Sequence, residues 1–198
     1  MMETKRLFTG VIVIIIVTIG VFGFLVTSMS FPNDNNNDTT TDDTDDSIYP
    51  PLIFDDQDLL NESIEVPNWN FTLSTNETLS MADLRGRITI LDFMARWCGY
   101  CAQQNHHLRI LQEEYGDSIN IVSVCVDLAD TLEQLTEYKE EKNVTWPLGL
   151  DIDGSSDWLR VRYIPTLVIV DGDGMLRWNH EGTWDATSMA ETIESLMG

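Results

Sequence analysis

The chain has 198 residues and a formal net charge of −22, with 33 acidic residues against 11 Lys and Arg. Such a surface repels nucleic-acid phosphates, so we expect no nucleic-acid partner. The length suits one domain of about 100 to 200 residues with additional segments, and three cysteines are too few for a disulfide scaffold.

The first predicted element is a membrane anchor over residues 7–29. Leu7 to Val26 is an uncharged run of apolar and small residues, long enough to cross a hydrocarbon core of about 30 Å as a helix. A Lys-Arg pair directly precedes the run, so the positive-inside rule places residues 1–6 in the cytoplasm and the rest of the chain outside. We therefore expect a single-pass protein with the lipid bilayer as a partner. A cleaved signal peptide is the alternative, but its apolar core would be shorter and no Ala-x-Ala site follows.

Residues 30–61 are predicted to form an acidic, disordered linker. Their run of Asn, Asp and Thr has almost nothing apolar to bury, and its carboxylates repel one another. Sequons that can accept glycans outside the cytoplasm occur in the linker and beyond it. They begin at Asn37, Asn61, Asn70, Asn76 and Asn143.

A globular pattern over residues 62–198 predicts the folded domain. Apolar runs predict strands, and apolar residues at three- and four-residue spacing predict helices. The expected strands are 71–73, 88–94, 119–126, 166–170 and 175–178, and the expected helices are 80–84, 98–115, 131–142, 155–161 and 185–197. This order implies an α/β fold in which a mixed central sheet is flanked by helices on both sides.

Two cysteines three positions apart, Cys98 and Cys101, stand where a predicted buried strand meets a predicted helix. A pair at this spacing can close and reopen a small disulfide. A helix N-terminus stabilises negative charge, which favours the thiolate of Cys98 as the nucleophile. Cys101 would resolve the mixed disulfide, and that step needs a proton acceptor.

Asp92 is the candidate proton acceptor. It is the one ionisable residue in the apolar strand 88–94, and burial would raise its pKa toward the range of a general base. The alternative is a solvated aspartate on an edge strand. Ile164 and Pro165 precede another buried strand and form the second half of the site, although sequence alone favours a trans peptide bond there.

The run from Asp92 to Cys101 (Asp-Phe-Met-Ala-Arg-Trp-Cys-Gly-Tyr-Cys), combined with Ile164-Pro165-Thr166, resembles the thioredoxin superfamily. The layout of residues 66–198, with an inserted segment at about 144–150, is similar to the membrane-anchored TlpA/ResA group. The resemblance implies a thioredoxin fold with a TlpA-type insertion.

The resemblance also implies roles for the site residues. Cys98 would be the exposed nucleophile and Cys101 the buried resolving thiol, with a cis-Pro165 facing the pair. Ile164 would offer its backbone edge to a substrate strand, and Trp97 would form a partial lid. Gly99 and Tyr100 match neither the Gly-Pro of thioredoxin nor the frequent Pro-Pro, and this dipeptide tunes the redox potential.

The expected activity is reduction of protein disulfides outside the cytoplasm by a thiol-disulfide oxidoreductase, with no cofactor beyond the redox-active Cys98–Cys101 disulfide. The resemblance implies a membrane thiol carrier as electron donor and apocytochrome c, hence cytochrome c biogenesis, or misoxidised secreted proteins as substrates. A disulfide-forming oxidase or isomerase is the alternative in the same class. A copper- or other metal-binding module is the alternative from a different class.

The remaining candidate residues favour structural roles. Cys125 in an apolar strand is expected to be a buried, inert thiol. His106 and His107 are adjacent on a helix and point about 100° apart, so they cannot both face one ion well. Three aspartates resemble a calcium loop but lack the spacing of an EF-hand, so we expect turn residues and no metal. They are Asp151, Asp153 and Asp157.

Overall fold

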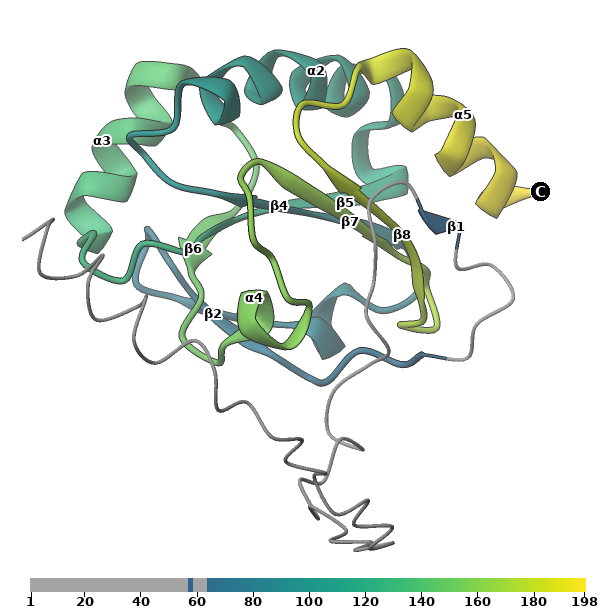
Figure 1. Ribbon diagram of the computed structural model, residues 1–198, viewed down its shortest axis with the longest axis horizontal. Coiled ribbons are helices and arrows are strands. Elements are labelled where there is room, and N and C mark those ends of the chain that lie inside the picture. Colours follow the sequence, from purple (N-terminus) through teal and green to yellow (C-terminus); the bar gives the residue numbers. More distant parts are fainter. Residues whose placement is uncertain (1–56, 59–63) are drawn as a thin grey trace, which may run out of the picture. The chain divides into compact units, whose positions relative to one another are not determined.

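The structure, a computed structural model, describes residues 57–58 and 64–198 (Figure 1). The predicted N-terminal segment, the predicted anchor at 7–29 and nearly all of the predicted linker at 30–61 lie outside these residues. Two linker residues, Gln57–Asp58, form strand β1 and pair with Trp178 and Asn179. Within the described part of the chain, no helix is both long and apolar enough to cross a membrane.

The strands of the described residues form one mixed sheet in the order β1-β8-β7-β4-β5-β6-β2-β3. β4 pairs in parallel with β5, and β5 with β6, whereas the other neighbours are antiparallel. The bounds are β1 Gln57–Asp58, β2 Asn70–Leu73, β3 Thr78–Ser80, β4 Ile88–Met94, β5 Ile119–Cys125, β6 Leu148–Leu150, β7 Thr166–Val170 and β8 Leu176–Glu181.

Helices cover both faces of this sheet, which confirms the predicted α/β architecture. The bounds are η2 Met81–Leu84, α2 Gly99–Tyr115, η3 Gly116–Ser118, α3 Leu132–Lys142, α4 Ser155–Trp158 and α5 Ala186–Met197. In Figure 1, α2, α3 and α5 lie above the sheet and α4 lies below it. Each face has its own buried apolar cluster.

Strand β4 is central and is buried along its whole length. Successive side chains of a strand point to opposite faces. Ile90 and Met94 belong to the cluster beneath α2, whereas Leu91 and Phe93 belong to the other cluster. By this alternation Asp92 lies on the α2 face, so the strand brings its one carboxylate beneath the helix that carries the two cysteines.

The structure differs from the predicted elements mainly at short or edge segments. The helix predicted over 155–161 ends at Trp158, and Arg160 then takes a left-handed φ of 55°. The predicted strand 175–178 is longer, because β8 reaches Glu181. The segment 144–150 contributes β6, which joins β5 to β2; its assignment as a TlpA-type insertion stays a prediction.

Candidate active site

The two cysteines lie at the start of α2, directly after β4. They are joined by a disulfide, and Cys98 is the N-cap residue of the helix. The Cys101 backbone N–H donates to Cys98 Sγ at 3.0 Å, which favours negative charge on that sulfur. Cys98 is 6% exposed and Cys101 is 0% exposed. Cys98, which the resemblance implied to be exposed, is therefore largely buried in the disulfide form, although it is the more accessible of the two cysteines.

The loop before β7 faces this pair. The Ile164–Pro165 peptide bond is cis, and the Ile164 carbonyl oxygen lies 3.7 Å from Cys98 Sγ. The Thr166 hydroxyl donates to the Tyr163 carbonyl at 2.8 Å, and the Gly182 N–H donates to the Pro165 carbonyl at 2.7 Å. These bonds hold the loop against the sheet, with its backbone beside the reactive sulfur.

Asp92 is fully buried beneath α2. Burial raises its pKa from 3.8 to about 7, and a hydrogen bond from the Ser123 hydroxyl opposes part of that rise. Ser123 donates to Asp92 Oδ2 at 2.7 Å, whereas Oδ1 has no hydrogen-bond partner. The interpretation of Asp92 as a solvated edge-strand residue is wrong, because β4 lies between β5 and β7. The carboxyl can hold or release a proton near neutral pH, as a general base must.

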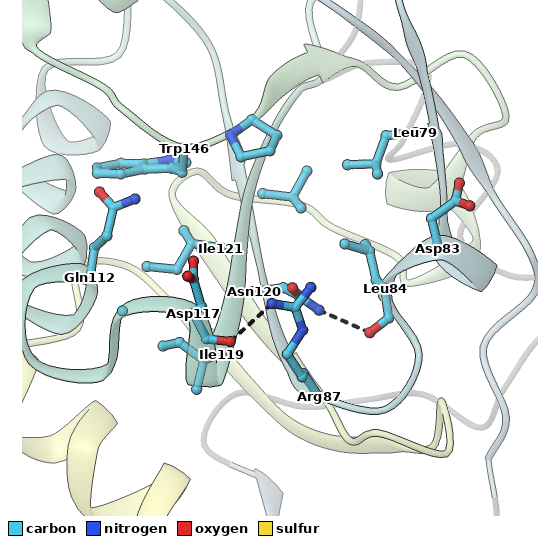
Figure 2. Close-up of a pocket in the computed structure, with 13 residues that line it drawn as sticks. Leu79, Asp83, Leu84, Arg87, Gln112, Asp117, Ile119, Asn120, Ile121 and Trp146 are labelled. Atoms are coloured by element: carbon cyan, nitrogen blue, oxygen red, sulfur yellow. Dashed lines mark hydrogen bonds between the residues drawn. The ribbon is translucent and has the colours of Figure 1, made fainter.

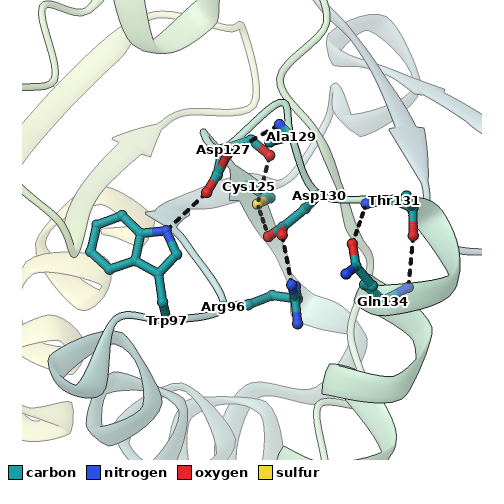
Figure 3. Close-up of polar contacts among 8 residues, drawn as sticks. All are labelled: Arg96, Trp97, Cys125, Asp127, Ala129, Asp130, Thr131 and Gln134. Carbon is teal, nitrogen blue, oxygen red and sulfur yellow. Dashed lines mark hydrogen bonds and ion pairs between the residues drawn. The ribbon is translucent and has the colours of Figure 1, made fainter.

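The two residues before Cys98 are tied to the loop after β5 (Figure 3). Trp97 is 71% exposed, yet its indole N–H donates to Asp127 Oδ2 at 2.9 Å and lowers the pKa of Asp127. Arg96 forms an ion pair with Asp130 at 2.8 Å. These contacts fix the approach to Cys98, and they place Trp97 at the surface rather than in the core.

Sequence reasoning missed Asp127 and Asp130, although a signal for them exists. Both follow β5, and β5 runs parallel to β4. Because the carboxyl ends of parallel strands meet at one edge of the sheet, polar residues after β5 fall beside residues after β4. The acidic pair after β5 was therefore a candidate neighbour of Cys98.

Three exposed aromatic side chains lie next to the cysteine pair or the cis-Pro165 loop in sequence. Tyr100 and Tyr163 are each 67% exposed, and each lies next to an element of the site in sequence, as Trp97 does. Gly99 is also exposed, and a Cβ added there would meet no atom within 4 Å. Large apolar groups at the rim give a disulfide-bearing polypeptide a surface to contact.

Cys125 is buried beside this site without facing solvent (Figure 3). Its thiol donates to Asp130 Oδ2 at 3.5 Å, and burial raises its pKa to about 12. A thiol held in its protonated form is a poor nucleophile.

We expect Cys125 to stay unreactive in the folded, reduced protein. At pH 8 an aromatic disulfide reagent should oxidise or label the Cys98–Cys101 pair and react with Cys125 only after denaturant is added. Mass spectrometry of tryptic peptides locates the label, and Cys125→Ala should retain full disulfide-exchange activity. Rapid labelling of Cys125 in the native protein would contradict its assignment as an inert thiol.

The histidines and aspartates considered as metal ligands have other positions and contacts in the structure. Among residues 57–58 and 64–198 no group of three or more His, Cys, Asp or Glu is arranged to hold a metal ion. His106 is exposed on α2 and so does not pack into the core. Asp151 is buried, and its carboxylate accepts from the backbone and hydroxyl groups of Ser155 and Ser156. From the turn before α4 it accepts hydrogen bonds from the first two backbone N–H groups of that helix, as expected for a turn residue.

A pocket of about 320 Å³ lies beside the first half of β5 (Figure 2). None of the predicted site residues lines it. At its wall Arg87 donates to the Asp117 carbonyl and Asn120 to the Leu84 carbonyl, each at 2.9 Å. Its link to the site is Trp146, which lines the pocket and is also bonded to Ser123.

The fold and the site together define the class of this protein: a thioredoxin-like thiol-disulfide oxidoreductase. The chain belongs to the AhpC/TSA family, whose sequence pattern matches residues 64–179. The resemblance to thioredoxin-like proteins is thereby confirmed.

Known proteins with related sequences are named as thioredoxin-like proteins or thiol-disulfide oxidoreductases. Thioredoxin-like protein YneN of Bacillus subtilis is 27% identical over 136 residues, which are 68% of this chain and 80% of that protein. Thiol-disulfide oxidoreductase ResA of the same species is 21% identical over 123 residues, or 62% of this chain and 68% of that protein.

Solved structures share the fold. A DsbF homologue from Corynebacterium diphtheriae superposes with a TM-score of 0.63 and 19% identity, covering 75% of this chain and 97% of that one. StoA from Bacillus subtilis superposes with a TM-score of 0.55 and 21% sequence identity, covering 66% of this chain and 98% of that one. At these identities the structures show the fold alone.

Proposed function

We propose that the protein is a membrane-tethered, extracytoplasmic oxidoreductase that reduces protein disulfides through Cys98 and Cys101. The observation that carries this proposal is the placement of the pair. Cys98, the more accessible of the two cysteines, faces the cis-Pro165 loop, Cys101 is fully buried, and the buried carboxyl of Asp92 lies on the same face of the sheet. Each of these features serves one step of thiol-disulfide exchange.

In the first step the Cys98 thiolate attacks one sulfur of the substrate disulfide. A Cys98–substrate bond forms, the substrate disulfide breaks, and the other substrate sulfur leaves as a thiolate that takes up a proton. Ile164, whose carbonyl lies 3.7 Å from Cys98 Sγ, offers a backbone edge to the substrate strand at this stage.

In the second step Cys101 gives its proton to Asp92 and attacks Cys98 Sγ. The Cys98–Cys101 disulfide forms, the mixed disulfide breaks, and the remaining substrate sulfur leaves as a thiolate. Two electrons pass from the protein dithiol to the substrate, so a second dithiol must reset the pair. We assign that role to a membrane thiol carrier, and apocytochrome c or misoxidised secreted proteins to the role of substrate.

The membrane tether is supported by the sequence. The run from Leu7 to Val26 has the length and composition of a spanning helix, and the preceding Lys-Arg pair favours a cytoplasmic N-terminus. A single-pass topology places the oxidoreductase domain outside the cytoplasm. There the acidic segment 30–61 would act as its spacer.

The direction of electron flow is tested by the redox potential of the Cys98–Cys101 couple, measured by equilibration with glutathione. We expect a value nearer that of thioredoxin, about −270 mV, than that of DsbA, about −120 mV, together with reduction of insulin disulfides. A value near that of DsbA would replace the reductase with a disulfide-forming oxidase. Tight one-to-one copper binding that Cys98→Ser abolishes, without insulin reduction, would replace the enzyme with a metal-binding module.

A further inference from the structure

A chain of buried hydrogen bonds starts at Oδ2 of Asp92, the carboxyl oxygen that has a partner. The Ser123 hydroxyl donates to Asp92 Oδ2 at 2.7 Å, and the Trp146 indole N–H donates to Ser123 Oγ at 2.9 Å. Ser123 is 2% exposed, Trp146 is 2% exposed and Asp92 is 0% exposed. We call these three residues the relay.

The chemistry of the indole group gives the relay a direction. An indole N–H can only donate, whereas a hydroxyl has one proton to donate and lone pairs that accept. Because Trp146 occupies an acceptor site of Ser123, the hydroxyl proton of Ser123 remains available to Asp92. A carboxylate that accepts a hydrogen bond is stabilised in its ionised form.

Trp146 is held in place from both sides. The Lys139 ammonium donates to the Trp146 carbonyl at 2.6 Å, and the Ser123 N–H donates to the Pro147 carbonyl at 2.9 Å. Figure 2 shows the indole ring at the wall of the pocket beside β5, with Ile121 next to it. These bonds fix the backbone that carries the ring, in the segment between α3 and β6.

We propose that Trp146 and Ser123 are positioning residues, which keep a donor directed at Asp92 and so stabilise the carboxylate that takes the proton of Cys101. This inference rests on the proposed function. It assigns to the segment between α3 and β6 a control over the second step of the exchange.

Other ionisable groups share the core around Asp92. Tyr138 from α3 accepts a hydrogen bond from Asn105, and its pKa is raised mainly by burial and further by the charge of Asp92. Lys139, half-buried, has a lowered pKa because of burial. β7, paired with β4 on the other side, has no ionisable residue. The remaining buried or half-buried ionisable residues of this cluster are Cys98, Cys101, Tyr115 and Cys125.

The oxidised protein isolates the titration of Asp92, because the disulfide removes Cys98 and Cys101 from the titrating groups. We would follow the carboxyl carbon signal of labelled aspartate by NMR in the full-length protein in detergent micelles, and Asp92→Asn would identify the signal. We expect Ser123→Ala to raise the pKa of Asp92 by at least about one, because the charged form loses its hydrogen bond. Trp146→Phe should raise it less.

A double variant separates the relay from loss of packing. If Trp146 acts through Ser123, adding Trp146→Phe to Ser123→Ala leaves the pKa of Asp92 where Ser123→Ala alone puts it. Trp69→Phe is the matched control, since it removes the same atoms from the core on the opposite face of the sheet, and it should leave Asp92 unchanged. An unchanged pKa in Ser123→Ala, or equal shifts by Trp146→Phe with and without Ser123, overturns the relay.

The second readout is the rate at which Cys101 resolves a preformed Cys98 mixed disulfide. With the pKa of Asp92 one higher, the ionised fraction at pH 7 falls about five-fold, so the rate in Ser123→Ala should fall similarly and recover at higher pH. A shifted pKa of Asp92 with an unchanged pH dependence of the resolution rate would show that the relay does not act in the exchange reaction. Absence of any disulfide exchange in the wild-type protein would instead reject the proposed function. The NMR titration would still test whether Ser123 and Trp146 control the pKa of Asp92.

Discussion

We expect Cys98→Ser to lose nearly all disulfide reduction, whereas Cys101→Ser should perform the first step and stop at a mixed disulfide. The two sulfurs are chemically alike but unequally placed, because Cys98 caps α2 beside the cis-Pro165 loop and Cys101 is fully buried. A serine hydroxyl at position 98 cannot supply the thiolate, so we expect turnover of insulin disulfides to fall at least about a thousand-fold.

The same two variants should differ in what they capture. Cys101→Ser leaves the Cys98–substrate bond unresolved, so a covalent adduct accumulates, and a dithiol releases it. Cys98→Ser should form none, because the two remaining thiols, Cys101 and Cys125, are both buried. Non-reducing electrophoresis and mass spectrometry measure the adduct, with Cys125→Ser as the matched control that keeps both turnover and resolution. Adducts on Cys101 in Cys98→Ser would reverse the assigned roles.

Much of this site follows from the sequence because its main parts are local. The apolar run Ile88–Met94 predicts a buried strand, and Cys98 and Cys101 fall at the start of the next helix. Asp92 stands out because a carboxylate in an apolar strand is uncommon. The burial that raises its pKa follows once that strand is central in the sheet.

The partners of these residues depend on tertiary register, which the local pattern does not contain. Ser123 meets Asp92 because the two are paired residues in the parallel β4–β5 ladder. Trp146 reaches Ser123 from a segment that follows a separate helix. The pairing of Gln57–Asp58 with β8 is similar, since two polar residues in an acidic segment carry no strand pattern of their own.

The buried carboxyl also has a consequence for stability, and its sign can be derived. The pKa of Asp92 rises from 3.8 to about 7 in the folded protein, mainly because burial disfavours its charge. Well below pH 3.8 the carboxyl is protonated in both the folded and the unfolded chain, so its ionisation does not affect stability. As pH rises toward 7 the unfolded chain releases the proton first, so folding loses stability. Above pH 7 this loss reaches about 4 kcal/mol.

Asp92→Asn removes this loss and is therefore expected to be more stable than the wild type at pH 8. A buried amide with an unpaired N–H would cost about 1 to 3 kcal/mol, but that cost is the same at every pH. The change in the stability difference between pH 4 and pH 8 isolates the ionisation and should approach about 4 kcal/mol. Urea unfolding of the oxidised proteins at both pH values gives the free energies. A difference that does not change with pH would contradict the raised pKa of Asp92.

Asp185→Asn supplies a control of opposite sign. Asp185 is the N-cap of α5, and hydrogen bonds from Ser188 lower its pKa, so it contributes stability at neutral pH that is lost as pH falls. Its replacement should destabilise at pH 8. If Asp92→Asn gains stability there while the resolution of the Cys98 mixed disulfide slows, the two results together have one explanation. The core then retains a destabilising carboxyl because Cys101 needs a proton acceptor whose pKa lies near 7.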